Sequence, residues 1–400
     1  MGLLHRRHVI IGLLAVFIAW ANAQWVMPPP PSAPALACVS CHKAICDSHA
    51  ITAHFRTSSL ASASTIKGRF KGRVVFNDRL EVVLEKKKDG RFFQTALFNG
   101  ALYESEPFDV VIGSGRKGQS YLYWDSVRLF QLPISYYTPL DSWCNSPGYP
   151  MNLVYFNKQV PGQCMECHAT GAKVLEMEGG AVGFERGSVV YGIDCERCHG
   201  DGQAHVAWHT GHPGEKVGVS IVSARRLGRQ QRLDACALCH SGFRRGLRPS
   251  FTFRVGDTLD KFSTPNYNTD SSGNLDVHGN QYGLLTTSRC FQGSQMDCSS
   301  CHNVHKDEWG REEVFSQRCM SCHRAPGVDA GGGQSAGCKF PPVKERGLVG
   351  NCVDCHMPAL PSQKILLQFS GAAKPVHDLV RTHHIGIYPE ISRAYLRARK

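Results

Sequence analysis

The sequence predicts a fold made mostly of short α-helices and irregular segments, with a small antiparallel β domain inserted near its beginning. Three observations on the 400 residues lead to this prediction. A short cysteine and histidine motif recurs over most of the chain. The intervals between its later copies leave room for little but short helices and loops. One long stretch after the first copy lacks the motif and consists of short β-branched and aromatic runs separated by turn residues.

The recurring motif is C-x-x-C-H, and it occurs seven times, numbered here in chain order. Two cysteines at this spacing can reach both vinyl groups on one edge of a porphyrin while the next imidazole binds iron, as in haem c. Zinc knuckles and redox C-x-x-C motifs, the alternatives, do not need a histidine directly after each cysteine pair. The predicted attachment residues are Cys38, Cys41, Cys164, Cys167, Cys195, Cys198, Cys236, Cys239, Cys298, Cys301, Cys319, Cys322, Cys352 and Cys355. The predicted proximal iron ligands are His42, His168, His199, His240, His302, His323 and His356.

Seven covalently bound haems c would supply much of the interior of a chain of this length. The segments around them should be disordered without haem. The haems would also bring about 14 propionate carboxylates, which would offset most of the positive charge of the polypeptide. That formal charge is +12. We therefore interpret the Lys and Arg excess mainly as partners of propionates, and expect no nucleic-acid binding.

The N-terminus has the pattern of an export signal. Residues 1–23 carry a basic start, a short apolar run and an A-x-A cleavage site. Cleavage is expected near Ala23 and Gln24, which would give a periplasmic or extracellular protein without a further transmembrane segment. An uncleaved N-terminal anchor is the alternative. The Pro-rich residues 24–37 should form an extended linker.

The rest of the chain divides into four predicted parts, which differ in residue composition and in their content of C-x-x-C-H motifs. They are a first haem module (38–66), a β-rich insert (67–145), a six-haem domain (146–365), and a C-terminal ligand-bearing segment with a basic tail (366–400). In the insert, Asp89-Gly90 predicts a tight hairpin. The G-x-G-x-x-G of residues 113–118 precedes a strand instead of a helix, so a hairpin loop is favoured over a dinucleotide site. Near the C-terminus, His377 and His384 are spaced to share one face of a helix.

Four cysteines lie outside the motifs and could form up to two disulfides in an oxidising compartment. They are Cys46, Cys144, Cys290 and Cys338. Three pairings are possible, and a bond between Cys290 and Cys338 would staple the region of the fifth and sixth motifs.

Several segments resemble a large family of exported multihaem cytochromes c, the superfamily of hydroxylamine oxidoreductase and its tetrahaem electron acceptor. The segments are YGIDCERCHGDGQAH, LDACALCHSGFRRGLRP, DVHGNQYGLL, MDCSSCHNVHKDEW, CVDCHMPALP and the late THHI. The resemblance covers most of the chain after residue 23. It implies a multihaem cytochrome c fold, with short helices and loops around stacked haems that have histidine on both faces. It also implies that His54, His205, His278, His305 and His384 are distal ligands, whereas His49 stands where relatives often have an aromatic residue.

The supply of histidine is sufficient for two imidazoles on every iron. Ten remain outside the signal and the motifs: His49, His54, His205, His209, His212, His278, His305, His377, His383 and His384. As candidate distal ligands we select His54, His205, His278, His305, His377 and His384, with His209 and His383 as second choices. Irons with two axial imidazoles have no open position for a substrate, and they favour lower potentials than Met/His ligation.

These features predict an electron-transfer protein more than an enzyme. The expected partners are redox proteins, such as other cytochromes, quinol-oxidising complexes or terminal reductase complexes. One alternative is a multihaem oxidoreductase in which one iron lacks a distal ligand and acts on a small nitrogen or sulfur compound. Another is a subunit of a polymeric cytochrome conduit, with histidine from one subunit binding haem of the next.

Overall fold

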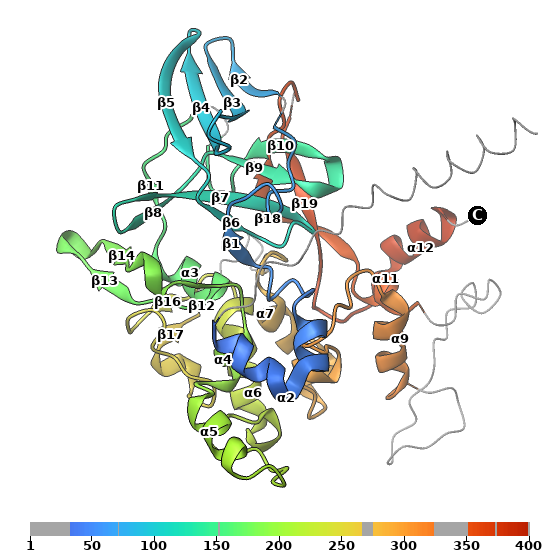
Figure 1. The fold of residues 1–400 in the computed structure, drawn as a ribbon. Coiled ribbons are helices and arrows are strands. Elements are labelled where there is room, and N and C mark those ends of the chain that lie inside the picture. The colour runs from blue at the N-terminus through green and yellow to red at the C-terminus, as the bar shows by residue number, and fades with distance from the viewer. Residues whose placement is uncertain are drawn as a thin grey trace, which may run out of the picture. The chain divides into compact units, whose positions relative to one another are not determined.

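The computed structural model describes residues 33–70, 72–150, 153–265, 275–323, 351–372 and 374–398. The predicted signal peptide, most of the predicted linker and Cys338 therefore lie outside the described residues. The described residues belong to one compact unit (Figure 1). Within the described residues, no helix combines the length and the apolar character needed to cross a membrane.

Strands account for nearly as many residues as helices, so the prediction of a mostly α fold is wrong. The error lies in the segments between the motifs and after the last one. Short strands there form antiparallel pairs, which satisfy their backbone hydrogen bonds where a loop would leave them open. These pairs are β12 (Ala169–Gly171) with β15 (Val190–Tyr191), β13 (Val174–Glu176) with β14 (Val182–Phe184), β16 (Arg245–Gly246) with β17 (Ser263–Thr264), and β18 (Ala359–Leu367) with β19 (Val376–Arg381).

Two larger antiparallel sheets follow the first motif. The first has the order β2-β3-β4-β5, formed by Arg73–Asn77, Leu80–Lys86, Phe92–Phe98 and Ala101–Pro107. Its β3 and β4 are joined through the Asp89-Gly90 turn, and Leu80 pairs with Phe98 at the far end. The hairpin predicted at Asp89-Gly90 is therefore present.

The second sheet has seven strands and carries the path β1-β6-β7-β8-β11, with β9 also paired to β7 and β10 paired to β9. Their bounds are Ser58–Leu60, Val110–Ile112, Gly118–Asp125, Arg128–Gln131, Lys158–Gln159, Ile134–Tyr137 and Ser142–Asn145. Residues 113–118 form the turn between β6 and β7, as expected for a hairpin loop.

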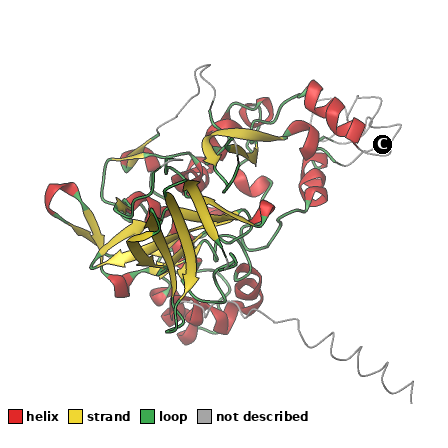
Figure 2. Cartoon of the chain, turned by 90° about the horizontal axis from the view of Figure 1, so that it is seen from above, coloured by secondary structure: helices red, strands yellow, loops and turns green. Residues whose placement is uncertain are grey.

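The seven-stranded sheet has apolar side chains on both faces, and they alternate along the strands. In β7, Tyr121 and Tyr123 join a core shared with Val82 and Leu84 of the four-stranded sheet. Leu122, between them, joins a second core on the opposite face. Because successive side chains of a strand point to opposite faces, one strand serves two cores. The sheet is therefore a middle layer, with β2–β5 on one side and the motif-bearing helices on the other (Figure 1). Figure 2 shows the strands from above, with helices around them.

The second core joins this sheet to the region that carries the later motifs. Val110 and Leu129 of the sheet pack with Met165, Phe184 and Phe251. Met165 lies inside the second C-x-x-C-H motif and is fully buried. The sheet thus contacts the motif region through its own apolar surface.

The helices are short and gather around the motifs. They are α2 (Ala33–His49), α3 (Gly162–His168), α4 (Cys195–His199), α5 (Gln203–Gly211), α6 (Arg229–His240), α7 (Gln281–Thr286), α8 (Arg289–Gln292), α9 (Glu312–Met320), α11 (Val353–His356) and α12 (Pro389–Ala398). The single-turn 3-10 helices are η1 (Thr138–Leu140), η2 (Glu178–Gly180), η3 (Arg186–Ser188), η4 (Ala224–Arg226), η5 (Leu259–Lys261) and η6 (Cys298–Ser300).

The C-terminal segment differs from its prediction. His377 lies in β19 and His384 follows that strand, so the two do not share a helix face. Residues 376–381 read V-H-D-L-V-R, and their buried residue, Asp378, faces β9 through a hydrogen bond from Tyr137. Strand pairing with β18 therefore determines the conformation here, and the seven-residue spacing of the histidines does not.

Candidate haem-binding site

Each C-x-x-C-H motif lies on or beside a helical turn. The histidine ends the helix in α3, α4, α6 and α11. In α2 the helix kinks at His42, whose φ and ψ are −113° and 33°. The fifth motif starts on η6, and the sixth begins in the last turn of α9. A helical turn places cysteines three residues apart on one face, which is the arrangement that two thioether bonds to one porphyrin edge require.

The motifs lie next to one another in an order that differs from their order in the chain. Helix α2 contacts α4, α3 contacts α6, α6 contacts η6, and α9 contacts α11. The thiols of the same motifs lie within hydrogen-bonding range of each other. These thiol pairs are Cys38 with Cys195, Cys167 with Cys239, Cys236 with Cys298, and Cys319 with Cys352. The first motif therefore adjoins the third, the fourth adjoins both the second and the fifth, and the sixth adjoins the seventh.

Four motif histidines face a histidine from elsewhere in the chain. The ring centres are 6.4 Å apart in His42 with His205, 6.0 Å in His54 with His240, 6.1 Å in His199 with His305, and 6.2 Å in His302 with His383. The angles between the ring planes are, in the same order, 14°, 83°, 12° and 21°. An iron bound by two imidazoles, with bonds of about 2 Å, separates the ring centres by about 6 Å. These four pairs therefore fit the two faces of a haem iron.

Hydrogen bonds orient several of these rings. Nδ1 of His199 lies 2.8 Å from the carbonyl of Val222, and Nδ1 of His205 lies 2.9 Å from the carbonyl of Val219. Nδ1 of His168 lies 2.9 Å from the hydroxyl of Thr57. When Nδ1–H donates to an oxygen in this way, Nε2 becomes the unprotonated nitrogen and is available to a metal.

Burial keeps many of these imidazoles neutral. It lowers the pKa of His54 to about 4 and that of His383 to about 4. Burial also lowers the pKa of His168, His240, His278, His302 and His305. Nδ1 of His383 is buried without a hydrogen-bond partner among the described residues. Only the neutral ring can donate a lone pair to iron, so the lowered pKa values suit axial ligands.

His49 is held in a way that does not suit a ligand. Its Nε2 lies 2.9 Å from the carbonyl of Ile193, and its Nδ1 lies 3.3 Å from the carbonyl of Val304. Both ring nitrogens thus face carbonyl oxygens, although the ring centre is 6.2 Å from that of His305. His49 instead connects α2 to the segments beside the third and fifth motifs.

The remaining candidates are oriented, but they do not face a motif histidine within the described part of the chain. Nδ1 of His377 lies 2.7 Å from the carbonyl of Ser362, and Nδ1 of His384 lies 2.7 Å from the hydroxyl of Thr287. The backbone N–H of His278 donates to Asp276 over 2.8 Å. His209 lies beside His205, with ring centres 4.5 Å apart and its Nε2 buried without a partner. His212 stacks on Trp208 and is exposed.

Arginine–carboxylate pairs join the motif segments to one another and, in one case, to β19. Arg197 of the third motif lies 3.6 Å from Glu166 of the second, and their side chains are only 8% and 12% exposed. The other pairs are Arg232 with Asp297, Arg318 with Glu308, and Arg381 with Asp354. Among the described residues these four arginines bind carboxylates of the protein, and they fix motif segments to one another or to β19. The predicted role of the other Lys and Arg residues as partners of propionates stays a prediction.

Comparison with known proteins gives consistent results. Residues 153–200, which include the second and third motifs, match the family model for cytochrome c554 and c-prime. The multiheme cytochrome MtrA of Shewanella baltica (strain OS185) is 25% identical over 179 residues, 40% of this chain. The chain spans about half the length of this curated relative, 51%. The solved structure of outer cell wall cytochrome OcwA superposes with a TM-score of 0.52 at 17% identity, over 90% of this chain and 80% of that one.

The chain is similar to multihaem cytochromes c. The likeness to OcwA is one of fold, and the matches to the family model and to MtrA support covalently bound haem c and an electron-transfer function. Haem binding would explain three of these features together. The ring pairs and the oriented Nδ1 atoms suit haems held between two imidazoles, and the cysteine pairs of the motifs suit covalent attachment.

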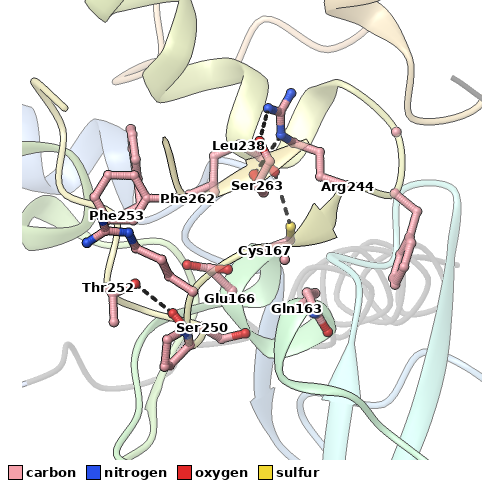
Figure 3. Close-up of a pocket in the computed structure, with 15 residues that line it drawn as sticks. Gln163, Glu166, Cys167, Leu238, Arg244, Ser250, Thr252, Phe253, Phe262 and Ser263 are labelled. Atoms are coloured by element: carbon pink, nitrogen blue, oxygen red, sulfur yellow. Dashed lines mark hydrogen bonds between the residues drawn. The ribbon is translucent and has the colours of Figure 1, made fainter. Parts of the chain in front are cut away.

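A small pocket in this multihaem cytochrome-like chain opens beside the second motif (Figure 3). It is lined by Cys167, Leu238 and Arg244, among others, and the Cys167 thiol lies 3.8 Å from the carbonyl of Leu238. Arg244 is buried and donates to the hydroxyl of Ser263 over 2.7 Å and to Asp260 over 2.6 Å. The pocket therefore belongs to the region where the second and fourth motifs meet.

The cysteines outside the motifs form no disulfide among the described residues. Cys46, Cys144 and Cys290 are free thiols, and Cys144 is only 1% exposed. The predicted bond from Cys290 to Cys338 involves a residue outside the described ones. Within the same residues, no group of three or more His, Cys, Asp or Glu side chains is arranged to hold a bare metal ion.

Proposed function

We propose that the protein is an exported heptahaem c-type cytochrome that carries electrons through closely spaced haems, most of them with two histidine ligands, to a redox partner protein. Haem iron supplies the one-electron chemistry when bound. The polypeptide would attach each haem through one motif and orient the axial imidazoles. It would also hold neighbouring attachment points close together. Other cytochromes, quinol-oxidising complexes and terminal reductase complexes are the partner classes that such a carrier would serve.

The four histidine pairs are the observation that carries this proposal. Each pair joins a motif histidine to a ring from a different part of the sequence, and the separations of 6.0–6.4 Å match one iron between two nitrogens. In three of these pairs burial also lowers the pKa of at least one ring, as it does for His54, His240, His302, His305 and His383. Six-coordinate iron has no open position for a substrate, which favours transfer over catalysis at these four sites.

The contacts between motifs support a continuous route for electrons. Attachment cysteines of the first and third motifs are in contact, as are those of the fourth and fifth and those of the sixth and seventh. The Cys198 thiol of the third motif is close enough to the Cys239 thiol of the fourth for their charges to interact, and Cys301 of the fifth motif interacts in the same way with Cys322 of the sixth. We propose the order first, third, fourth, fifth, sixth, seventh, with the second beside the fourth.

Export is proposed on the basis of residues 1–23 and of the attachment chemistry, because haem c is attached outside the cytoplasmic membrane. The name of the OcwA structure places that cytochrome in an outer cell wall. A periplasmic or extracellular position for this protein agrees with both observations. Sequencing the N-terminus of the mature protein would test cleavage near Ala23 and Gln24.

The haem count and the ligands can be tested on the purified haem-loaded protein. Intact mass should show seven haems added to the mature chain, and electron paramagnetic resonance should show low-spin iron at the four paired sites. A mass increase that corresponds to fewer than seven haems would contradict the count.

His305 and His49 provide a matched pair of variants, because their ring centres lie 6.2 Å apart and the His305 ring faces His199 of the third motif. The variant His305→Ala should convert one low-spin iron into a high-spin one, because His199 would lose its opposite ligand. The variant His49→Ala should leave all low-spin signals in place, because both of its ring nitrogens already face carbonyls. The reverse result would show that His49 is the ligand.

A further inference from the structure

The loop of residues 113–118, between β6 and β7, leaves the seven-stranded sheet toward the motif region. Its backbone is fixed at both ends. Gly113 donates from its N–H to the carbonyl of Thr57 in the segment that enters β1, over 2.6 Å. Gly113 has a φ of +102°, and a Cβ atom there would lie 2.7 Å from the carbonyl oxygen of Gly118. The loop is therefore a rigid part of the sheet, and its two charged side chains project from a fixed base.

Arg116 reaches the segment that follows His305. One nitrogen of its guanidinium donates to Oδ1 of Asp307 over 2.6 Å, and the other donates to Oδ2 of the same carboxylate. The second nitrogen also donates to the carbonyl of Ile51 over 3.1 Å. The side chains of Arg116 and Asp307 are 22% and 30% exposed. Asp307 is two residues after His305, so this two-point contact fixes the short turn that presents the His305 ring.

Lys117 reaches the segment between His377 and His383. Its Nζ donates to Oδ1 of Asp378 over 2.6 Å and to the carbonyl of Leu379 over 2.5 Å. The carboxylate of Asp378, 8% exposed, also accepts a hydrogen bond from the hydroxyl of Tyr137 over 2.9 Å. Two side chains from the seven-stranded sheet, one on the loop and one on β9, thus hold β19 just before His383.

We propose that Arg116 and Lys117 are positioning residues, through which the seven-stranded sheet places the His305 ring opposite His199 and the His383 ring opposite His302. This role rests on the proposed function, because it assumes that these rings are axial ligands. The strands between the first two motifs would then have a role inside the molecule, because they hold in place the segments that carry the axial histidines. An axial ligand must be held to within about 0.5 Å, and a short turn without such contacts does not achieve this.

The test compares variants of the haem-loaded full chain by carbon monoxide binding and by electron paramagnetic resonance. Carbon monoxide binds reduced haem iron only where an axial position opens. In Arg116→Gln, carbon monoxide should bind at one haem several times faster than in the wild type, and the low-spin signal of the His199–His305 site should shift. The variant Arg116→Lys should restore the wild-type binding rate and low-spin signal only partly, because lysine cannot make the two parallel hydrogen bonds. Lys117→Gln should change the His302–His383 signal instead.

Arg128→Gln is the matched control. Arg128 lies on the same sheet and pairs with Asp125 at 2.7 Å, but this contact stays within one hairpin. The control should behave as the wild type. If Arg116→Gln is obtained in low yield, Asp307→Asn removes the same contact from its other side and should give the same spectral change.

The outcomes separate this inference from the proposed function. If His305→Ala produces high-spin iron while Arg116→Gln and Lys117→Gln match the wild type, the ligand assignment stands and the positioning role is wrong. If each variant disturbs both sites equally, the loop only stabilises the fold and the positioning role is again wrong. If His305→Ala itself leaves every iron low-spin, the proposed ligand assignment fails first.

Discussion

At the scale of single residues, charge placement decides how the attachment motifs are held. Glu308 lies between the fifth and sixth motifs and accepts two hydrogen bonds from Arg318, one of them over 2.8 Å, and one from the N–H of Asn303 over 3.0 Å. Arg318 also donates to the carbonyl of Cys301. The side chain of Glu308 is 10% exposed. One carboxylate therefore connects the residue before Cys319 to the end of the preceding motif.

This contact predicts a pH dependence of stability. Hydrogen bonds from Arg318 lower the pKa of Glu308 from 4.5 to about 2. Because the folded carboxyl has the lower pKa, the unfolded chain takes up the proton first as the pH falls. The stabilisation is fully present above pH 4.5 and is lost between pH 4.5 and about 2. The variant Glu308→Gln should lower the free energy of unfolding by about 2 kcal/mol at pH 7 and by nearly nothing at pH 2, as measured by chemical denaturation.

Glu313→Gln serves as the control for this measurement. Glu313 pairs with Arg311 at 3.5 Å, and the two side chains are 64% and 58% exposed. A surface pair of this kind contributes little, so stability should change by less than about 0.5 kcal/mol at any pH. Equal effects of the two variants would mean that Glu308 contributes only through the net charge.

At the scale of elements, the segment from His54 to Ser58 connects three motifs. The carbonyl of His54 accepts from the N–H of Ile193, just before the third motif, over 2.9 Å. Thr57 contacts Nδ1 of His168 in the second motif, and the His54 ring faces His240 of the fourth. Strand β1 continues this segment into the seven-stranded sheet. One short segment therefore connects the sheet to three motifs.

Gly192 tests the importance of this element. It has a φ of +75°, and a Cβ atom there would lie 2.1 Å from the carbonyl oxygen of Phe55. The variant Gly192→Ala must displace the segment that presents His54, and we expect it to destabilise the protein by about 1–3 kcal/mol. It should also weaken the low-spin signal of the His54–His240 site, which separates local displacement from general loss of stability.

Gly214→Ala is the corresponding control, because a Cβ atom at Gly214 meets nothing within 4 Å and its backbone needs no left-handed φ. Denaturation midpoints and resonance spectra of this variant should match those of the wild type. An unchanged His54–His240 signal in Gly192→Ala would show that the close approach to Phe55 does not position the ligand.

A C-x-x-C-H motif can be recognised in the sequence, whereas the partner of its histidine cannot, and the reason is physical. A C-x-x-C-H motif is local, because its five residues occupy about one helical turn wherever it occurs. The partner of a motif histidine depends on contacts between distant segments. His383 and His384 are adjacent in the chain, yet only His383 faces a motif histidine, because strand β19 and its turn set which ring points inward. Among histidines outside the motifs, His54 and His49 are distinguished in the sequence by the family resemblance and not by their local spacing.

The fold prediction was wrong where it relied on motif density alone. Short intervals between motifs do not exclude sheet, because segments as short as Val174–Glu176 and Val182–Phe184 pair as a hairpin. The strands after the first motif were predicted because their apolar residues alternate over longer runs. The arginine–carboxylate pairs had no signal in the sequence, because neither partner stands at a fixed spacing from the other.

At the scale of the whole molecule, the motif contacts form a series with the first motif at one end. Its histidine, His42, faces His205 on α5, and its Cys38 thiol contacts Cys195 of the third motif. In the proposed order of haems, an electron that enters or leaves at the first motif would pass the third. The potential of this end site therefore determines whether electrons collect at it.

Exchanging the proposed axial ligand His205 would test how the first site depends on its ligands. Methionine is a neutral axial ligand that raises the potential of haem iron, and the variant His205→Met should raise that of the first site on the order of 100 mV. In a spectroelectrochemical titration one of the haems should then be reduced before the others, with the total number of electrons unchanged. The variant His212→Met, on the exposed side of the same segment, should titrate as the wild type. Identical titrations of both variants would contradict ligation by His205.

The core shared by the two large sheets has a consequence for biogenesis. All its buried members lie between Ile66 and Phe156, in the interval that separates the first attachment motif from the second. Because this core contains no attachment cysteine, we expect it to form by side-chain burial before any porphyrin is joined to the chain. In the newly exported polypeptide this core would then form before haems are attached to the later motifs. Because it lies between the first motif and the other six, it would separate the first attachment site from the rest during assembly.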